Sequence, residues 1–186
     1  MTYKEDAKMT EVRTAHTADL DATTLAAART LLDEAFDGDL TELDWEHALG
    51  GVHALLWAGS DLIGHASVVQ RRLLHAGRAL RAGYVEGVAV HRDHRGRGHG
   101  GALMAALERV IRNAYDLGAL SSSAEGRRMY VSRGWLPWQG PTFALTPMGI
   151  ARTEEDDDGV HVLPTPAVPL DRTAELVCDW RDGDVW

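Results

Sequence analysis

A glycine-rich segment in the middle of this 186-residue chain constrains its fold more than any other feature. The segment reads VAVHRDHRGRGHGG over residues 88–101 and stands between an apolar run and an amphipathic helical pattern. Glycines let the backbone N–H groups of residues 96–101 point inward at the start of a helix, where the helix dipole favours an anion. The segment therefore predicts a diphosphate-binding turn between a strand and a helix.

The same glycines satisfy the dinucleotide-binding pattern G-x-G-x-x-G at Gly96, Gly98 and Gly101, so a nicotinamide enzyme is an alternative. That pattern needs a strand that runs directly into the first glycine, yet five polar or basic residues intervene here. It also needs an acid at the end of the next strand, whereas Asp116 falls at the end of the predicted helix. A Walker loop is excluded because no GK[ST] occurs.

Hydrophobic periodicity and turn signals predict a mixed set of elements around this segment. Strands are expected at residues 9–15, 51–57, 62–74, 79–90, 119–122, 135–138, 160–164 and 173–180. Helices are expected after the N-cap Asp21, after the glycine loop as far as Gly118, and at 125–132. The buried face of the middle helix is expected to be Leu103, Met104, Leu107, Val110, Ile111 and Ala114. Because no repeat or linker occurs, residues 1–186 are expected to form a single domain.

Charge is distributed unevenly along the chain, whose net charge of −9 argues against nonspecific nucleic-acid binding. Residues 33–46 carry seven acids and no base, and residues 150–186 carry ten acids against three Arg. Between them, residues 71–133 carry twelve Arg against five acids. This pattern suggests an anionic ligand for the middle and a cationic ligand for the flanks, with solvated charged faces as the alternative.

Neither a membrane segment nor a metal motif is indicated. The first ten residues lack an apolar leader core, and no apolar run approaches the roughly 18 residues that span a bilayer, so a cytoplasmic protein is expected. The one cysteine, Cys178, is expected to be a small semi-buried hydrophobe. His91 and His94 could hold a metal, but no HExxH or Cys/His cluster supports this, and no metal is expected.

As far as Trp138, the predicted order of elements resembles the core of the GNAT N-acetyltransferases. Arg95, Gly98 and Gly100 match that family's acyl-CoA pyrophosphate signature, an Arg or Gln followed by x-x-Gly-x-Gly or Ala. The segment RRMYVSRGW at 127–135 is similar to the family's helix in which a tyrosine faces the CoA sulfur, here Tyr130. The resemblance implies an α/β (α+β) GNAT fold: a mixed, mostly antiparallel central sheet with flanking helices and a splayed strand pair that binds CoA.

The same resemblance implies acetyl-CoA as co-substrate and a backbone donor for the thioester oxygen near Val88. Gly87 permits a local bulge that would splay this strand from its neighbour and leave backbone N–H groups free. The residues expected to bind the cofactor are Val88, Val90, Arg95, Gly96, Arg97, Gly98, Gly100 and Gly101.

A closer resemblance, to the aminoglycoside 2'-N-acetyltransferases, covers almost the whole chain. It rests on TELDWEHALGG at 41–51, YVEGVAV at 84–90, LGALSSSA at 117–124, SRGWLPWQGPT at 132–142 and CDWRDGDVW at 178–186. The resemblance implies a small cationic substrate held by Asp39, Asp44, Glu86, Ser121, Asp156, Asp184 and the α-carboxylate of Trp186. The run of acids leaves Asp156 and Asp157 as alternatives, and homodimers are common in this family.

Two side chains are expected to carry the chemistry, together with the backbone at Val88. Glu86 would take a proton from the substrate ammonium through water, and Tyr130 would donate one to the leaving thiolate. A phenol has a pKa near 10 and is protonated at working pH, whereas a thiol has a pKa near 8.5. The alternatives are a solvent-facing strand glutamate, a tyrosine that packs a short helix, and an Asp44 that caps a helix at Trp45.

Three functions follow from this reading. The first is acetylation of the 2'-amine of aminoglycosides, and the second is acetylation of another cationic amino-sugar or polyamine. The third is a noncatalytic acetyl-CoA-binding protein, against which the retention of Glu86 and Tyr130 argues. The sequence does not separate the first two.

Overall fold

The computed structural model describes residues 9–186, which share one sheet of ten strands. Residues 1–8 lie outside the described residues, and with them lie the expected start of the domain and most of the segment examined for a leader. The strands are β1 (Thr10–His16), β2 (Val52–Ala58), β3 (Asp61–His75), β4 (Arg78–Val90), β5 (Leu117–Ser121), β6 (Leu136–Pro137), β7 (Thr142–Thr146), β8 (Gly149–Arg152), β9 (Val160–Pro164) and β10 (Leu176–Asp179). The helices are α1 (Ala22–Ala35), α2 (Glu42–His47), α3 (His99–Ala114) and α4 (Arg127–Ser132), with short 3-10 turns at 17–19, 92–94 and 154–156.

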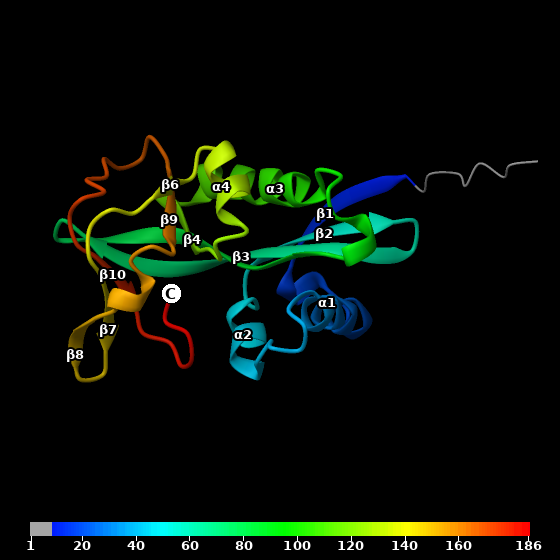
Figure 1. Cartoon of the computed structure of the whole chain (residues 1–186), viewed down its shortest axis with the longest axis horizontal. Coiled ribbons are helices and arrows are strands. Elements are labelled where there is room, and N and C mark those ends of the chain that lie inside the picture. Colours follow the sequence, from blue (N-terminus) through cyan, green and yellow to red (C-terminus); the bar gives the residue numbers. More distant parts are fainter. Residues whose placement is uncertain (1–8) are drawn as a thin grey trace, which may run out of the picture.

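The long strands β3 and β4 form the middle of the sheet. β1, β2, β3 and β4 pair in sequence as an antiparallel meander, while β4 pairs with β5 in parallel. The order across the sheet is β6-β9-β5-β4-β3-β10-β7-β8, with β2 and β1 added to the first half of β3. Figure 1 shows α1 and α2 on one face of the sheet and α3 and α4 on the other. The predicted mixed, mostly antiparallel sheet with flanking helices is confirmed.

The helix α3 begins where the glycine loop ends, and its apolar face packs on the sheet. Its N-cap is Gly98, at a φ of +80°, which a residue with a side chain rarely adopts. Four of the predicted core residues of α3 are fully buried: Leu103, Met104, Leu107 and Ile111. Val110 is partly buried, but the expectation for Ala114 is wrong: Ala114 is exposed, and Tyr115, the next residue, is the one that packs on Gly83 of β4.

Gly118 does not end the helix as predicted. The helix ends at Ala114, and Gly118 lies inside β5, where it pairs with Leu163. A Cβ at Gly118 would come within 3.0 Å of both Leu163 and Trp135, so the glycine is there for close packing of strand and indole. Its role in packing is not visible in the local sequence.

The C-terminal third forms more strands than its prolines and acids indicate. The strand predicted at 160–164 is confirmed as β9, and the one at 173–180 narrows to Leu176–Asp179. The hairpin of β7 and β8 was not predicted. β10 enters the sheet between the end of β3 and β7, antiparallel to β3 and parallel to β7. This arrangement brings the C-terminal residues back to the middle of the molecule (Figure 1).

Candidate active site

A bulge in β4 opens the sheet at the centre of the candidate site. His65 pairs with Ala89 and Ser67 pairs with Glu86, so two residues of β4, Gly87 and Val88, stand opposite one residue of β3. Gly87 has a φ of +56°, the left-handed conformation that a bulge of this kind requires. The pairing of β4 with β5 stops at Tyr84, and among the described strands the rest of β4 pairs only with β3. The predicted bulge and the splayed strand pair are therefore both present.

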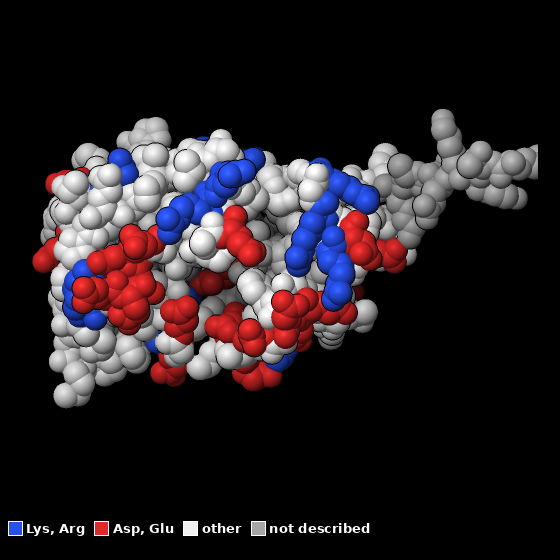
Figure 2. Space-filling view, in the orientation of Figure 1, with Lys and Arg blue, Asp and Glu red and all other residues white. Residues whose placement is uncertain are grey.

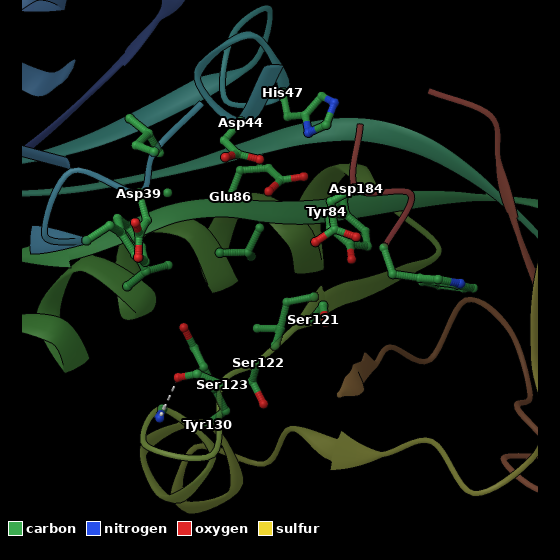
Figure 3. A pocket seen from close by; sticks show the side chains of 18 of the residues that line it. Asp39, Asp44, His47, Tyr84, Glu86, Ser121, Ser122, Ser123, Tyr130 and Asp184 are labelled. Atoms are coloured by element: carbon green, nitrogen blue, oxygen red, sulfur yellow. Dashed lines mark hydrogen bonds between the residues drawn. The ribbon is translucent and has the colours of Figure 1, made fainter. Parts of the chain in front are cut away.

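The splayed strands open onto the larger of two adjoining cavities, about 510 Å³ in volume. It is lined by residues of the α1–α2 segment, α2, β4, β5, α4 and the C-terminal segment (Figure 3). Most of the predicted catalytic and substrate-binding residues line it, namely Asp39, Asp44, Glu86, Val88, Ser121, Tyr130, Asp184 and Trp186. Residues more than 140 positions apart in the sequence thus meet at one place.

The second cavity, of about 340 Å³, is formed by the glycine loop and the start of α3. Six of the predicted cofactor residues line it: Val90, Arg95, Gly96, Gly98, Gly100 and Gly101. Arg97 is exposed and is not part of this lining. Arg95 donates from Nε to the Val90 carbonyl at 3.0 Å, which holds the loop against the end of β4. Met129 lines both cavities, so they lie next to each other at α4.

Tyr130 is held on the cavity wall by the packing of α4 on α3. Burial raises the pKa of Tyr130 to about 12, so its phenol keeps its proton at working pH. The buried carboxylate of Glu108 accepts from Arg133 Nε and Nη2, at 2.7 and 2.8 Å, and from Trp135 Nε1 at 3.1 Å. Glu108 was not predicted, because a single glutamate on the apolar face of a helix resembles a solvated residue.

Glu86 does not stand alone in the cavity. Arg181 donates from Nη1 to the Glu86 carboxylate, and both side chains are about 15% exposed. The Arg181 guanidinium also lies over the Tyr84 ring, 5.3 Å from its centroid, and donates from Nε to the Asp184 carbonyl at 2.6 Å. Arg181 was not predicted, because acids dominate the C-terminal segment in which it stands.

The structure distinguishes the two acids that the sequence left open. Asp157 accepts from Thr142 and Arg152, and the Arg152 contact lowers the pKa of Asp157 to about 2. Asp156 has no such cation among residues 9–186. Its partial burial, followed by the charge of Asp184, raises the pKa of Asp156 to about 6. Asp157 is thus occupied by the β7–β8 hairpin, whereas Asp156 lies close enough to Asp184 for that charge to raise its pKa, although Asp156 is not part of the cavity lining.

Asp44 has a structural contact besides its place in the cavity. The N-cap of α2 is Thr41, not Asp44, and the two residues form a capping box in which Asp44 accepts from the Thr41 backbone at 2.9 Å. Trp186 is likewise anchored, since its indole is 2% exposed and donates to Thr153 Oγ1 at 3.0 Å. Both side chains are therefore fixed before any ligand binds.

Charge around the cavity follows the uneven distribution in the sequence. Figure 2 shows acidic groups gathered over α2, the 154–158 turn and the C-terminus, around a hollow in this face. Basic side chains lie above and beside them, towards α4 and the glycine loop. No group of three or more His, Cys, Asp or Glu within residues 9–186 has the arrangement of a metal site.

Comparison with known proteins agrees with this geometry. A family model described as an acetyltransferase (GNAT) domain matches residues 11–137, which include the β4 bulge, the glycine loop and Tyr130. The chain belongs to the GNAT acetyltransferases. A curated member, the aminoglycoside 2'-N-acetyltransferase of Mycolicibacterium fortuitum, is 59% identical over 177 residues, which cover 94% of this chain and 91% of that protein.

Solved structures share the GNAT fold at low identity. ElaA of Escherichia coli is 21% identical with a TM-score of 0.58, over 84% of this chain and 99% of ElaA. Eis1 of Mycobacterium abscessus is 21% identical with a TM-score of 0.59, and this GNAT chain spans only 33% of its length. No helix in the described part of the chain is long and apolar enough to cross a membrane.

Proposed function

We propose that this GNAT protein transfers the acetyl group of acetyl-CoA to an amine of a polycationic amino-sugar, the 2'-amine of an aminoglycoside. The observation that carries the proposal is one cavity in which the β4 bulge and Tyr130 meet four carboxylates: Asp39, Asp44, Glu86 and Asp184. Identity of 59% to an aminoglycoside 2'-N-acetyltransferase supports the same substrate class.

The two adjoining cavities suit the two substrates. The diphosphate of acetyl-CoA binds the backbone N–H groups at the start of α3, where Gly96 and Gly98 adopt the positive φ that the turn needs. The pantetheine follows the unpaired edge of β4, with Val88 and Val90 beside it. The thioester carbonyl then lies at the bulge, and its oxygen accepts from the Val88 N–H.

The amine of the second substrate reaches this carbonyl from the acidic side of the cavity. Several carboxylates and few apolar anchors suit a rigid molecule with many ammonium groups, because charge-assisted hydrogen bonds are the strong ones. Asp39, Asp44, Asp156, Asp184 and the α-carboxylate of Trp186 bind these ammonium groups, and Ser121 binds a hydroxyl. The bound ammonium groups reduce the electrostatic repulsion between these carboxylates.

Starting from an ammonium group, the reaction removes two protons from the nitrogen and supplies one to the sulfur, so each turnover releases one net proton. Glu86, held by Arg181, accepts the proton of the attacking ammonium through water, so that a neutral amine attacks the thioester carbon. The tetrahedral intermediate carries its negative charge on the oxygen at the Val88 N–H. As the C–S bond breaks, Tyr130 donates its proton to the leaving thiolate, and CoA departs as the thiol. The nitrogen, which is positively charged after its attack, loses its second proton, and this proton returns through water to the Tyr130 phenolate to leave a neutral amide.

A thiol-release assay tests this function. Wild-type protein is incubated with acetyl-CoA and, in turn, aminoglycosides, a simple amino-sugar and spermidine. We expect saturable CoA release with 2'-amino aminoglycosides at a kcat/KM at least tenfold above that with the other amines. Equal or better turnover of the polyamine would favour the alternative of a general cationic-amine acetyltransferase. Absence of thiol release with every amine, in protein that binds acetyl-CoA, would favour a binding protein.

A homodimer and a cytoplasmic location remain predictions.

A further inference from the structure

Two fully buried histidines stand behind the β4 bulge and take no part in the reaction as proposed above. His53 on β2 and His65 on β3 are both 0% exposed, and neither lines the cavity. His53 Nδ1 and His65 Nε2 are 2.9 Å apart, and His65 Nδ1 lies 2.7 Å from the Gly87 carbonyl oxygen. The pair therefore links the interior of the sheet to the bulge itself.

The contact between His65 Nδ1 and the Gly87 carbonyl fixes the direction of every hydrogen bond in the series that leads to it. A carbonyl oxygen only accepts, so His65 Nδ1 must carry the proton. Burial lowers the pKa of both histidines to about 4, so each ring is neutral at neutral pH and has one N–H. His65 Nε2 then accepts from His53 Nδ1, and His53 Nε2 accepts from the Thr17 hydroxyl at 2.8 Å. Thr17 Oγ1 accepts in turn from the Gly50 N–H at 2.9 Å.

This series of hydrogen bonds ends at the Gly87–Val88 peptide group, which carries the proposed donor to the thioester oxygen. The Gly87 carbonyl and the Val88 N–H belong to a single peptide bond, and every described peptide bond is trans. In a trans peptide the C=O and the N–H point in opposite directions. A donor on the carbonyl side therefore turns the Val88 N–H away from His65, and Val88 lines the cavity.

Packing prevents this peptide from turning freely. A Cβ at Gly87 would lie 3.2 Å from Leu32 and 3.4 Å from the His65 ring, so the bulge sits tightly against both. A hydrogen bond to the carbonyl also polarises the peptide and strengthens the N–H as a donor, and aligned bonds reinforce each other by roughly 10–30% per bond.

We propose that His65, oriented by His53, is a positioning residue that fixes and polarises the Gly87–Val88 peptide as the donor for the thioester oxygen. This inference rests on the proposed acetyl transfer. It assigns a role in that reaction to two residues that touch neither substrate. The histidines neither gain nor lose a proton during turnover.

Two substitutions at His65 separate positioning from packing. His65→Leu keeps the side chain apolar and buried but removes the donor, whereas the amide N–H of His65→Asn can occupy nearly the place of Nδ1. We expect His65→Leu to lower kcat about tenfold or more, because loss of a whole oxyanion donor lowers kcat by about 10²–10³. The KM for acetyl-CoA should change less than about threefold, and His65→Asn should recover most of the kcat.

A spectroscopic readout follows the thioester directly. Infrared difference spectra of acetyl-CoA labelled with carbon-13 at the thioester carbonyl, bound to each protein, report the strength of the hydrogen bond to that oxygen. In the wild type the band should lie below that of free acetyl-CoA, and in His65→Leu it should shift back towards the free value. His65→Asn should restore the lower frequency.

A matched control lies on the same strand. His75 is also on β3, is 4% exposed and contacts a carbonyl oxygen, that of Glu175, through Nδ1 at 3.1 Å. His75→Leu should lower the melting temperature but leave the carbonyl band and kcat unchanged. If His65→Leu does not fold, His53→Leu replaces it, because it removes the hydrogen bond to His65 Nε2 that orients the His65 ring towards the Gly87 carbonyl; a smaller shift in the same direction is expected.

The outcomes separate this inference from the function on which it rests. Wild-type protein that does not bind acetyl-CoA would contradict the proposed function and the inference together. Wild-type protein that binds and turns over, with a folded His65→Leu of unchanged band and kcat, would overturn the positioning role alone. An Asn variant as impaired as the Leu variant would also overturn it.

Discussion

Among the single residues of the site, Tyr130 has the position and the protonation state that a general acid needs. It lines the main cavity, and burial raises its pKa to about 12. We predict that Tyr130→Phe lowers kcat about 10²-fold while acetyl-CoA still binds, which is within the range of general acid catalysis. Tyr115→Phe is the control, since Tyr115 is half-buried beside α3 and does not line the cavity. Pre-steady-state measurement of CoA release checks the prediction; an unchanged rate of the chemical step would leave Tyr130 a packing residue.

The charge of Asp156 is expected to destabilise the fold and to favour binding of a cationic substrate. Its pKa is raised to about 6, above the usual value near 3.9 for an unfolded chain, so its ionised form is disfavoured in the fold. The free energy of unfolding therefore falls as the pH rises from about 4 to 6, and the loss is complete above pH 6. We predict that Asp156→Asn raises the melting temperature at pH 7.5, has no such effect near pH 3.5, and raises the KM for an aminoglycoside.

Asp157→Asn is the contrasting variant. In the wild type the Asp157 carboxylate binds Arg152 and Thr142, and the pKa of Asp157 is lowered to about 2. Removal of this charge should therefore lower the melting temperature at pH 7.5. Thermal melts across this pH range, with KM values at pH 7.5, test both variants. A lower melting temperature for Asp156→Asn would show that its charge stabilises the apo protein, contrary to this account.

Some residues of the site were predicted from the sequence and others were not. Glu86, Tyr130 and the cavity acids were predicted because the resemblance to a known family implies them. Arg181, Glu108 and the His53–His65 pair were not, because their contacts join β4 to the C-terminus, α3 to α4, and β2 to β3. The two residues in each of these contacts lie at least twelve positions apart in the sequence, and no local pattern indicates which buried polar groups will meet.

At the scale of elements, the N-terminus of α3 is the feature on which cofactor binding depends. Gly98 has a φ of +80° and open space where a Cβ would point, so the fold tolerates a side chain there better than a bound diphosphate does. We predict that Gly98→Asp abolishes detectable acetyl-CoA binding in calorimetry, because a carboxylate would stand where the diphosphate approaches. Gly77→Asp in the β3–β4 turn, with a φ of +73° and equal space, is the matched control for backbone strain. Equal CoA affinity in the two folded variants would contradict the loop assignment.

Elements differed in how far the sequence predicted them. The β2–β4 meander, α1 and α3 were confirmed because their periodicity and turns are local. The β7–β8 hairpin was missed, since its strands are five and four residues long and the four residues of β8 are all exposed. Gly118 was misread for a similar reason, because a packing glycine inside a strand looks like a helix stop until Trp135 and Leu163 are placed around it.

The buried histidine pair has a consequence for the stability of the whole molecule. The pKa values of His53 and His65 are about 4, below the value near 6.5 of an unfolded histidine. Between these pH values the unfolded chain binds more protons, so the free energy of unfolding falls as the pH falls from about 6.5 to 4. Each histidine contributes a slope of up to about 1.4 kcal/mol per pH unit.

His65→Asn removes one of these two contributions without removing the donor to Gly87. Denaturant unfolding from pH 7.5 to 4 should therefore give a shallower loss of stability for this variant than for the wild type. Leu56→Ala, which truncates a buried side chain and removes no titratable group, is the control; it should lower the stability at every pH and keep the wild-type slope. Parallel pH profiles for the wild type and His65→Asn would show that the pair is not held neutral by the fold.

The central claim concerns the whole molecule, which joins a CoA loop, a bulged strand and an acidic cavity to acetylate one amine. The most direct measurement compares two aminoglycosides that differ only in an amine or a hydroxyl at the 2' position, with thiol release followed and each product analysed by NMR. We predict rapid release with the 2'-amine compound and a single acetyl group on that nitrogen, with a kcat/KM at least 10²-fold lower for the 2'-hydroxyl compound. Equal turnover of both compounds, or acetylation at another amine, would contradict the account.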